Sequence, residues 1–229
     1  MTLKGLQKLS LLDYPGEICA TVFVGGCNFR CPFCHNASLV IPDKFGETMP
    51  TDIFFEFLES RRGKLSAVCV SGGEPTLYHD LPEFVAKIKA MGYLVKLDTN
   101  GYRPEVLSAL IDGGLLDYVA MDIKNSPASY ARTVGIDNLD LTPVLRSVDI
   151  LREGRVPFEF RTTVVRELHS KDDILAIGEW LSGTERYYLQ PFKDSGDLID
   201  GGLSGYSEAE MTELLALVKR FVPLAQIRG

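Results

Sequence analysis

The stretch that matters most for the fold reads Gly25-Gly26-Cys27-Asn28-Phe29-Arg30-Cys31-Pro32-Phe33-Cys34-His35-Asn36. A continuous apolar run, residues 18–24, comes directly before it, as expected for a parallel strand that is buried on both faces. The polar, cysteine-rich stretch would then be the loop at the carboxyl end of that strand. In parallel α/β barrels this edge of the sheet carries the chemistry.

The three cysteines of the loop are spaced C-x₃-C-x₂-C. Iron–sulfur clusters are held by cysteine thiolates, and four thiolates fill the sites of a [4Fe–4S] cluster. Cys27, Cys31 and Cys34 would therefore leave one iron open, and an open metal position is typical of a reactive site. The alternative is a zinc ion held by the three cysteines and His35. It is less favoured because Cys34 and His35 are adjacent and no second cysteine pair follows. We expect His35 to be a neighbour of the cluster.

Further strand-like runs alternate with amphipathic segments along the chain. The predicted strands are residues 18–24, 67–71, 93–98, 118–123, 158–165 and 186–190, and the predicted helices are 51–61, 81–92, 104–113, 141–152, 171–181 and 207–222. Asp80 and Ser207 are predicted to begin two of these helices with capping boxes. The two polar stretches 124–140 and 193–206 are predicted to be long loops.

This alternation predicts a single domain over residues 1–229 with six strand–helix units. A complete eight-unit barrel takes about 250 residues, so six units favour a partial, open parallel (β/α)₆ barrel. A doubly wound open sheet is the alternative. The residues that follow the strands favour the barrel with a site at one edge: Gly72, Gly73 and Glu74 after the second strand, Asp98 at the end of the third, and Asp122 and Lys124 at the end of the fourth.

These motifs together resemble a known family. The cysteine pattern, with Phe33 before its last cysteine, resembles the cluster motif of the radical S-adenosylmethionine (radical SAM) enzymes, and residues 72–75 match that family's Gly-Gly-Glu-Pro motif. Residues 98–101 and 121–124 are similar to segments of the enzymes that activate glycyl radical enzymes. Residues 5–16 and 34–36 look most like the activating proteins of anaerobic ribonucleoside-triphosphate reductases. The resemblance covers roughly residues 5–192.

The resemblance implies cofactors and roles for these residues. A [4Fe–4S] cluster on the three cysteines would bind S-adenosylmethionine at its open iron. Residues 72–75 would contact the methionine moiety, and Asp98 and Asp122 would lie near a cation beside it. By their own chemistry, Lys124 would offset the carboxylate of S-adenosylmethionine or contact a partner, and Arg161 would clamp the ligand carboxylate with its planar guanidinium. Simpler alternatives are a tight turn at 72–75, turn chemistry for Asp98, a solvated Lys124, and an ion pair between Arg161 and an acid on a neighbouring strand.

The resemblance also implies a reaction and partners. The expected substrate is a glycine in a glycyl radical enzyme, first an anaerobic ribonucleotide reductase, with electrons from a flavodoxin or ferredoxin. Many formate-lyase activating enzymes have a histidine after the last strand, where this chain has Gln190-Pro191-Phe192-Lys193. The alternatives are activation of a pyruvate formate-lyase type enzyme, a radical reaction on a small molecule, and a non-catalytic electron carrier or zinc scaffold.

Composition restricts the kinds of partner and the cellular location that we expect for the protein. The formal net charge of −7 over 229 residues disfavours nucleic acid as a partner. The sequence contains no apolar run of 18 residues and no signal-peptide pattern, so we expect a cytoplasmic protein without a membrane span. Cys19 and Cys69 lie inside strand-like runs and are predicted to be core residues. His79 and His169 are predicted to be surface residues.

Overall fold

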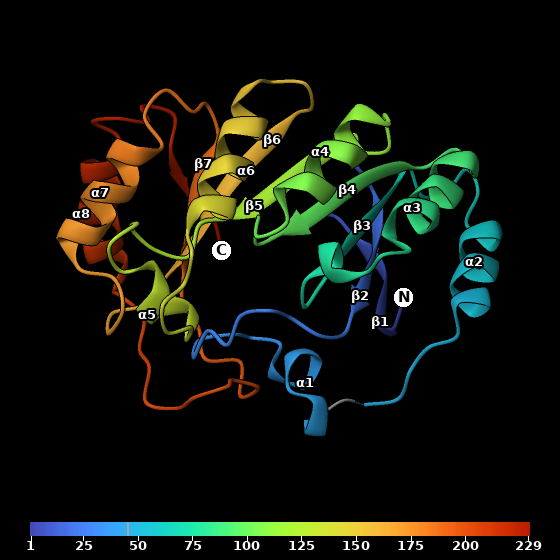
Figure 1. Ribbon diagram of the computed structural model, residues 1–229, viewed down its shortest axis with the longest axis horizontal. Helices are drawn as coiled ribbons and strands as arrows, with labels where there is room; N and C mark the ends of the chain where they lie inside the picture. The colour runs from blue at the N-terminus through green and yellow to red at the C-terminus, as the bar shows by residue number, and fades with distance from the viewer. Residues whose placement is uncertain (45) are drawn as a thin grey trace.

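The computed structural model of the chain describes residues 1–44 and 46–229 (Figure 1). One eight-stranded sheet runs through it in the sequential order β1 to β8. The strands are β1 Leu3–Ser10, β2 Cys19–Val24, β3 Ala67–Gly72, β4 Leu94–Thr99, β5 Tyr118–Asp122, β6 Phe158–Val164, β7 Tyr187–Pro191 and β8 Gln226–Ile227. β1 is antiparallel to β2, and all later neighbours are parallel.

The six predicted strands correspond to β2–β7, and their ends agree within one residue. The sheet is open, because β1 and β8 stand at opposite ends of its order over the part of the chain described. A doubly wound sheet needs a point where the strand order reverses, and the sequential order has none. The partial barrel prediction is therefore confirmed. The prediction omitted β1, a mostly polar edge strand, and β8, which has only two residues.

The helices lie mostly in an arc around the outer face of the curved sheet, whereas α1 and α5 lie apart from this arc, beside the cysteine loop 25–36 (Figure 1). They are α1 Ala37–Val40, α2 Thr51–Ser60, α3 Leu81–Ala90, α4 Pro104–Asp112, α5 Tyr130–Val134, α6 Thr142–Arg152, α7 Lys171–Trp180 and α8 Glu208–Val218. Short 3₁₀ turns occur at Pro42–Lys44 and Pro75–Leu77. None of the described helices is long and apolar enough to cross a membrane.

Two local predictions of helix structure have opposite outcomes. Ser207 begins α8 with the predicted capping box, in which its hydroxyl and the Glu210 carboxylate each bind the other residue's backbone N–H. The capping box at Asp80 is wrong, because this carboxylate makes no cap hydrogen bond and instead pairs with the amino group of Met1. The predicted loop 124–140 contains α5, whereas 193–206 has no helix or strand.

Strand residues alternate between an apolar outer face and a polar inner face. On β4, for example, Val95 and Leu97 join the main apolar core with the helices, whereas Lys96 and Asp98 are held by polar partners. Cys19 and Cys69 are fully buried, as predicted. The inner face is therefore buried yet charged, and the charged side chains continue to the edge where the parallel strands end.

Candidate active site

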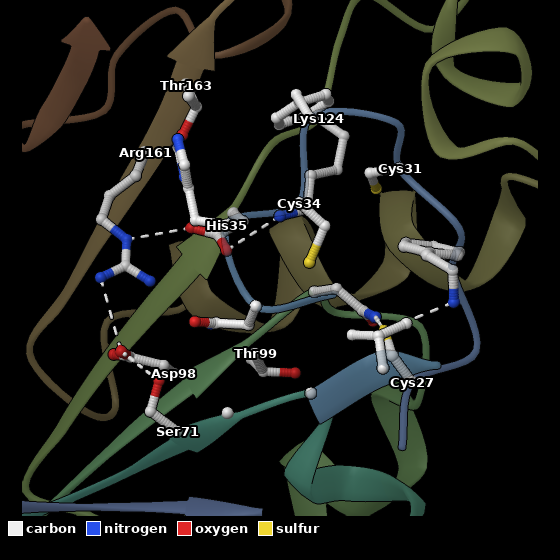
Figure 2. A pocket seen from close by; sticks show the side chains of 18 of the residues that line it. Cys27, Cys31, Cys34, His35, Ser71, Asp98, Thr99, Lys124, Arg161 and Thr163 are labelled. Atoms are coloured by element: carbon white, nitrogen blue, oxygen red, sulfur yellow. Dashed lines mark hydrogen bonds and ion pairs between the residues drawn. The ribbon is translucent and has the colours of Figure 1, made fainter. Parts of the chain in front are cut away.

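A cavity of about 230 Å³ lies at the carboxyl ends of the parallel strands (Figure 2). Cys27, Cys31 and Cys34 all line it, together with Phe33 from the same loop. Every other residue predicted for the site also lines it except Glu74, namely Gly72, Gly73, Asp98, Asp122, Lys124 and Arg161. The fold thus gathers residues from one loop and four strand ends, because parallel strands end at the same edge of the sheet.

Gly72, the last residue of β3, and Gly73 directly after it pack against the start of the cysteine loop. Gly72 has φ +120°, and a Cβ on Gly73 would lie only 1.9 Å from the carbonyl oxygen of Gly26. The N–H of Gly73 donates to the carbonyl of Val24 at 2.9 Å, so the turn extends the pairing of β2 and β3. Glycine is needed here for close approach of two backbone segments. These contacts show the tight turn; contact with the methionine moiety stays a prediction.

Glu74 lies fully buried behind this turn. Its carboxylate accepts hydrogen bonds from the backbone N–H and hydroxyl of Thr76, the hydroxyl of Thr99 and the N–H of Asn100, at 2.6–3.1 Å. Burial raises the pKa of Glu74, although these donors oppose the shift. The side chain therefore ties the turn after β3 to the end of β4. Its place in the structure supports the turn-anchor role, and direct contact with a cofactor stays a prediction.

The cysteine loop, residues 25–36, contains three thiols and no carboxylate side chain. Burial, and then the nearby carboxylate of Glu74, raises the pKa of Cys27 to about 11, and burial raises that of Cys31 to about 12. Without metal these thiols would stay protonated at neutral pH, and metal binding would displace their protons. Among the described residues, no set of three His, Cys, Asp or Glu side chains is arranged to hold a single metal ion.

One orphaned donor lies beside the cysteines. The side-chain Nδ2 of Asn28 is buried without a hydrogen-bond partner in the described part of the chain, while its Oδ1 accepts from Asn100 at 2.8 Å. Asn28 directly follows Cys27 in the loop. Three sulfur ligands around one cavity, with a spare buried N–H donor next to them, fit an iron–sulfur cluster held by this loop.

A row of alternating charges runs from β4 to β6, and all of its members except Lys96 line the cavity (Figure 2). It consists of Lys96, Asp98, Arg161, Asp122 and Lys124, three cations and two anions. Asp122 pairs with Nε of Arg161 and with Nζ of Lys124, each at 3.0 Å. Asp98 contacts Lys96 and lies 3.6 Å from Arg161. The predicted ion pair of Arg161 with an acid on a neighbouring strand is therefore present, with Asp122 of β5, and Lys124 is not a solvated lysine.

This row determines the charge state of its carboxyl groups. Burial alone would raise the pKa of Asp122, but Arg161 and Lys124 outweigh it and lower the value to about 2. Burial would also raise the pKa of Asp98, but the charges of Arg161 and Lys96 outweigh burial and lower this pKa. Both carboxylates are consequently ionised at neutral pH, and one cationic charge of the row remains uncompensated at the cavity wall.

The loop 193–206 is fastened to the cysteine loop at several points. The Asp197 carboxylate accepts from the N–H and the hydroxyl of Ser38, at 3.1 and 2.7 Å, and the N–H of Asp200 donates to the carbonyl of Pro32. His35 lines the cavity, and its Nε2 lies 2.7 Å from the carbonyl oxygen of Lys193. His35 is thus a neighbour of the cysteines, as expected.

The two remaining histidines differ. His79 is exposed as predicted, but the surface prediction for His169 is wrong. This side chain is fully buried, with ring nitrogens at 2.8 Å from the carbonyl of Lys124 and 3.1 Å from the N–H of Val165. Its ring also meets that of Phe33 edge-on, with centroids 6.3 Å apart. His169 therefore supports the cavity from behind.

Several cavity residues were not predicted. They are Ser71, Thr99, Asn100, Thr163 and Gln190. Each lies at or just beyond the carboxyl end of a strand, and this position is the signal that could have identified them. Their residue types are common in turns and strand ends, so composition alone does not distinguish them.

Comparison with known proteins agrees with this site. The family model of the radical SAM superfamily matches residues 21–181, from β2 to the end of α7. The chain therefore belongs to the radical SAM superfamily, whose enzymes use a [4Fe–4S] cluster and S-adenosylmethionine. Within it, the chain groups with the enzymes that activate glycyl radical enzymes. A protein of Methanocaldococcus jannaschii assigned to that class is 35% identical, over 98% of this chain and 94% of the relative.

Other relatives are more distant or longer. The pyruvate formate-lyase-activating enzyme of Streptococcus mutans is 27% identical over 83% of this chain and 77% of its own length. A protein of Thermococcus kodakarensis assigned as a GTP 3′,8-cyclase is 30% identical over 62% of this chain, which spans 46% of that relative. The crystal structure of QueE from Escherichia coli shares the fold, with a TM-score of 0.58 and 15% identity, over 100% of this chain and 93% of that one.

Proposed function

We propose that this chain activates a partner enzyme by removing a hydrogen atom from a backbone glycine of that partner. The observation that carries the proposal is the single cavity lined by three cysteine thiols, in a chain matched along its length by a protein assigned to this class. Three thiols leave room for a ligand at the metal centre, which an electron carrier does not need.

The residues of the cavity would share the work as follows. Cys27, Cys31 and Cys34 would hold three irons of the cluster. The cluster and S-adenosylmethionine together supply a 5′-deoxyadenosyl radical, and the protein binds, orients and shields the reactants. Arg161 and Lys124 would face the carboxylate of S-adenosylmethionine, since their positive charges already line the cavity. Phe33 would exclude water from the side of the loop.

The first partner to test is an anaerobic ribonucleoside-triphosphate reductase. Residues 5–16 and 34–36 support this choice by their resemblance to the activating proteins of such reductases. The cavity lies at an open edge of the sheet, where a glycine-bearing loop could approach. A flavodoxin or ferredoxin of the cytoplasm would supply the electron, by analogy with the family alone.

The test begins with reconstitution of the cluster without oxygen, followed by reduction and addition of S-adenosylmethionine. Formation of 5′-deoxyadenosine would demonstrate the class of reaction. A glycine-centred radical on the reductase, seen by electron paramagnetic resonance, would identify the substrate, and a reductase with that glycine changed to alanine is the control. Cys31→Ala should abolish both signals, because the third sulfur ligand is lost. Turnover by this variant would contradict the cluster assignment.

The same experiment also tests two alternative substrates. The Streptococcus mutans relative favours a pyruvate formate-lyase type partner, and the cyclase relative favours a small molecule. If the spin signal arises on a formate-lyase and not on the reductase, the first of these is correct. If 5′-deoxyadenosine forms only when a metabolite is added, the second is correct and the glycine proposal fails.

A further inference from the structure

Lys96 is a buried cation to which the proposed reaction assigns no task. It lies on β4, two residues before Asp98, and only 1% of its surface is exposed. Its Nζ contacts the Asp98 carboxylate and lies 3.6 Å from Sγ of Cys69 on the adjacent strand β3. Burying a lysine is costly unless its charge is compensated, and Asp98 supplies the compensating charge. Because Lys96 is not part of the cavity lining, any influence on a ligand must pass through Asp98.

The oxygens of Asp98 are already engaged by partners other than Arg161. Lys96 contacts Oδ1, and the hydroxyl of Ser71 donates to Oδ2 at 2.9 Å. Nη1 of Arg161 lies 3.6 Å from Oδ2, which is beyond the length of an ordinary N–H···O hydrogen bond. Arg161 is therefore held only loosely by Asp98.

The other side of Arg161 is held more firmly. Its Nε donates to Oδ1 of Asp122 at 3.0 Å, which fixes the plane of the guanidinium group. Within residues 1–44 and 46–229, its two terminal nitrogens make no hydrogen bond, and the side chain lines the cavity. A planar guanidinium whose two terminal nitrogens are available on one edge is suited to a carboxylate.

We propose that Lys96 is a positioning residue, which satisfies Asp98 from beneath the cavity and so leaves the Arg161 guanidinium available to the carboxylate of a bound ligand. This inference rests on the proposed function, which takes that ligand to be S-adenosylmethionine. Without Lys96, the ionised Asp98 would have Arg161 as its nearest cation and would draw it into a bidentate pair. The ligand would then lose a charge-assisted hydrogen bond.

The test compares two ligands that differ in one group. Affinities of the cluster-loaded protein are measured without oxygen by equilibrium dialysis, for S-adenosylmethionine and for its decarboxylated form, which keeps the sulfonium and the amino group. Lys96→Met removes the charge at similar side-chain length. It should weaken binding of S-adenosylmethionine roughly tenfold, as expected for one charge-assisted hydrogen bond, and leave the decarboxylated ligand unchanged.

Three further variants make the result specific. Lys96→Arg keeps the charge and should restore most of the affinity. Lys89→Met removes an ion pair with Asp117, outside the cavity lining, and should change neither affinity. Ser71→Ala removes the hydrogen bond to the other oxygen of Asp98 without removing a buried charge. It should therefore weaken binding of S-adenosylmethionine and leave binding of the decarboxylated ligand unchanged. This variant provides the test if Lys96→Met does not fold.

The outcomes separate the two proposals. If Lys96→Met lowers the affinity for both ligands equally, or does not lower the affinity for S-adenosylmethionine, the positioning role is overturned. Unchanged S-adenosylmethionine affinity in Ser71→Ala would also contradict it. If the unmodified, cluster-loaded protein does not bind S-adenosylmethionine, the proposed function itself fails, and this result is independent of what Lys96 does.

Discussion

Charged residues inside strand-like runs were the clearest sequence signal at the scale of single residues. Arg161 stood out because a buried charge needs a partner, and Asp122 stood out by its position at the end of a strand. The register of β5 and β6 places the two residues directly opposite each other. The structure adds Lys96 on β4, which sequence analysis passed over because a single lysine in an apolar run has no distinctive spacing. Its partner, Asp98, lies on the same face because residues i and i+2 of a strand do so.

Asp122 should make the stability of the protein sensitive to acid. Its pKa in the folded state is about 2, below the ordinary value of 3.8, so it contributes stability that is fully present above about pH 4. This contribution disappears as the pH falls through the folded-state value. In Asp122→Asn, the free energy of unfolding should drop by roughly 1–2 kcal/mol at pH 7, and the difference from the original protein should shrink toward pH 2.

Chemical unfolding of the metal-free protein between pH 7 and pH 2.5 checks this expectation. Asp112→Asn is the control, because Asp112 is an exposed carboxylate that pairs with Arg155 on the surface. It should change the unfolding free energy little at any pH. A constant difference between Asp122→Asn and the original protein across this range would show that the ion pairs do not stabilise the ionised carboxylate.

At the scale of elements, the site depends on segments that have little regular structure. The cysteine loop leads into α1, a helix of only four residues, and 193–206 crosses over this region without a helix or strand. Such segments bury little apolar surface of their own, so their position depends on a few hydrogen bonds. Sequence analysis identified both segments as loops but could not show that they contact each other.

Asp197 should hold the loop 193–206 against α1. In Asp197→Ala, two hydrogen bonds to Ser38 are lost, so amide hydrogen exchange in 193–206 and in α1 should become roughly fivefold to tenfold faster. Mass spectrometry of deuterated peptides provides the measurement. Asp194→Ala is the matched control, since among the residues that the structure describes the Asp194 side chain accepts only from Gly196, within the same loop. Equal acceleration in both variants would mean that Asp197 does not fasten the two segments together.

At the scale of the whole molecule, an open barrel must protect its inner face where the sheet does not close. β8 is only two residues long, but it brings Arg228 to Glu159, which is fully buried on β6. Arg228 donates to the Glu159 carboxylate from both terminal nitrogens, and Tyr118 adds a third hydrogen bond at 3.0 Å. This group secures the last strand against the barrel interior.

Removing Arg228 should therefore destabilise the entire fold. Arg228→Met leaves the Glu159 charge buried and undercompensated, and we expect a loss of about 2–3 kcal/mol in the free energy of unfolding. Arg155→Met removes surface ion pairs with Asp112 and Glu153 and should cost less than about 1 kcal/mol. Urea unfolding followed by circular dichroism compares the two. Equal, small effects would indicate that β8 contributes nothing to closing the structure.

The sequence by itself determined the alternation of strands and helices, the open barrel and the three cysteines of one loop, because these depend on local periodicity and on spacing within that loop. Only the tertiary structure decided which charges meet. Lys96 and Asp98 are two residues apart on β4, and their pairing shows in the structure because that face of the strand is buried. The pairing of Arg161 with Asp122 and the burial of His169 join segments that are distant in the chain. Such contacts follow from strand register and from the common edge at which parallel strands end.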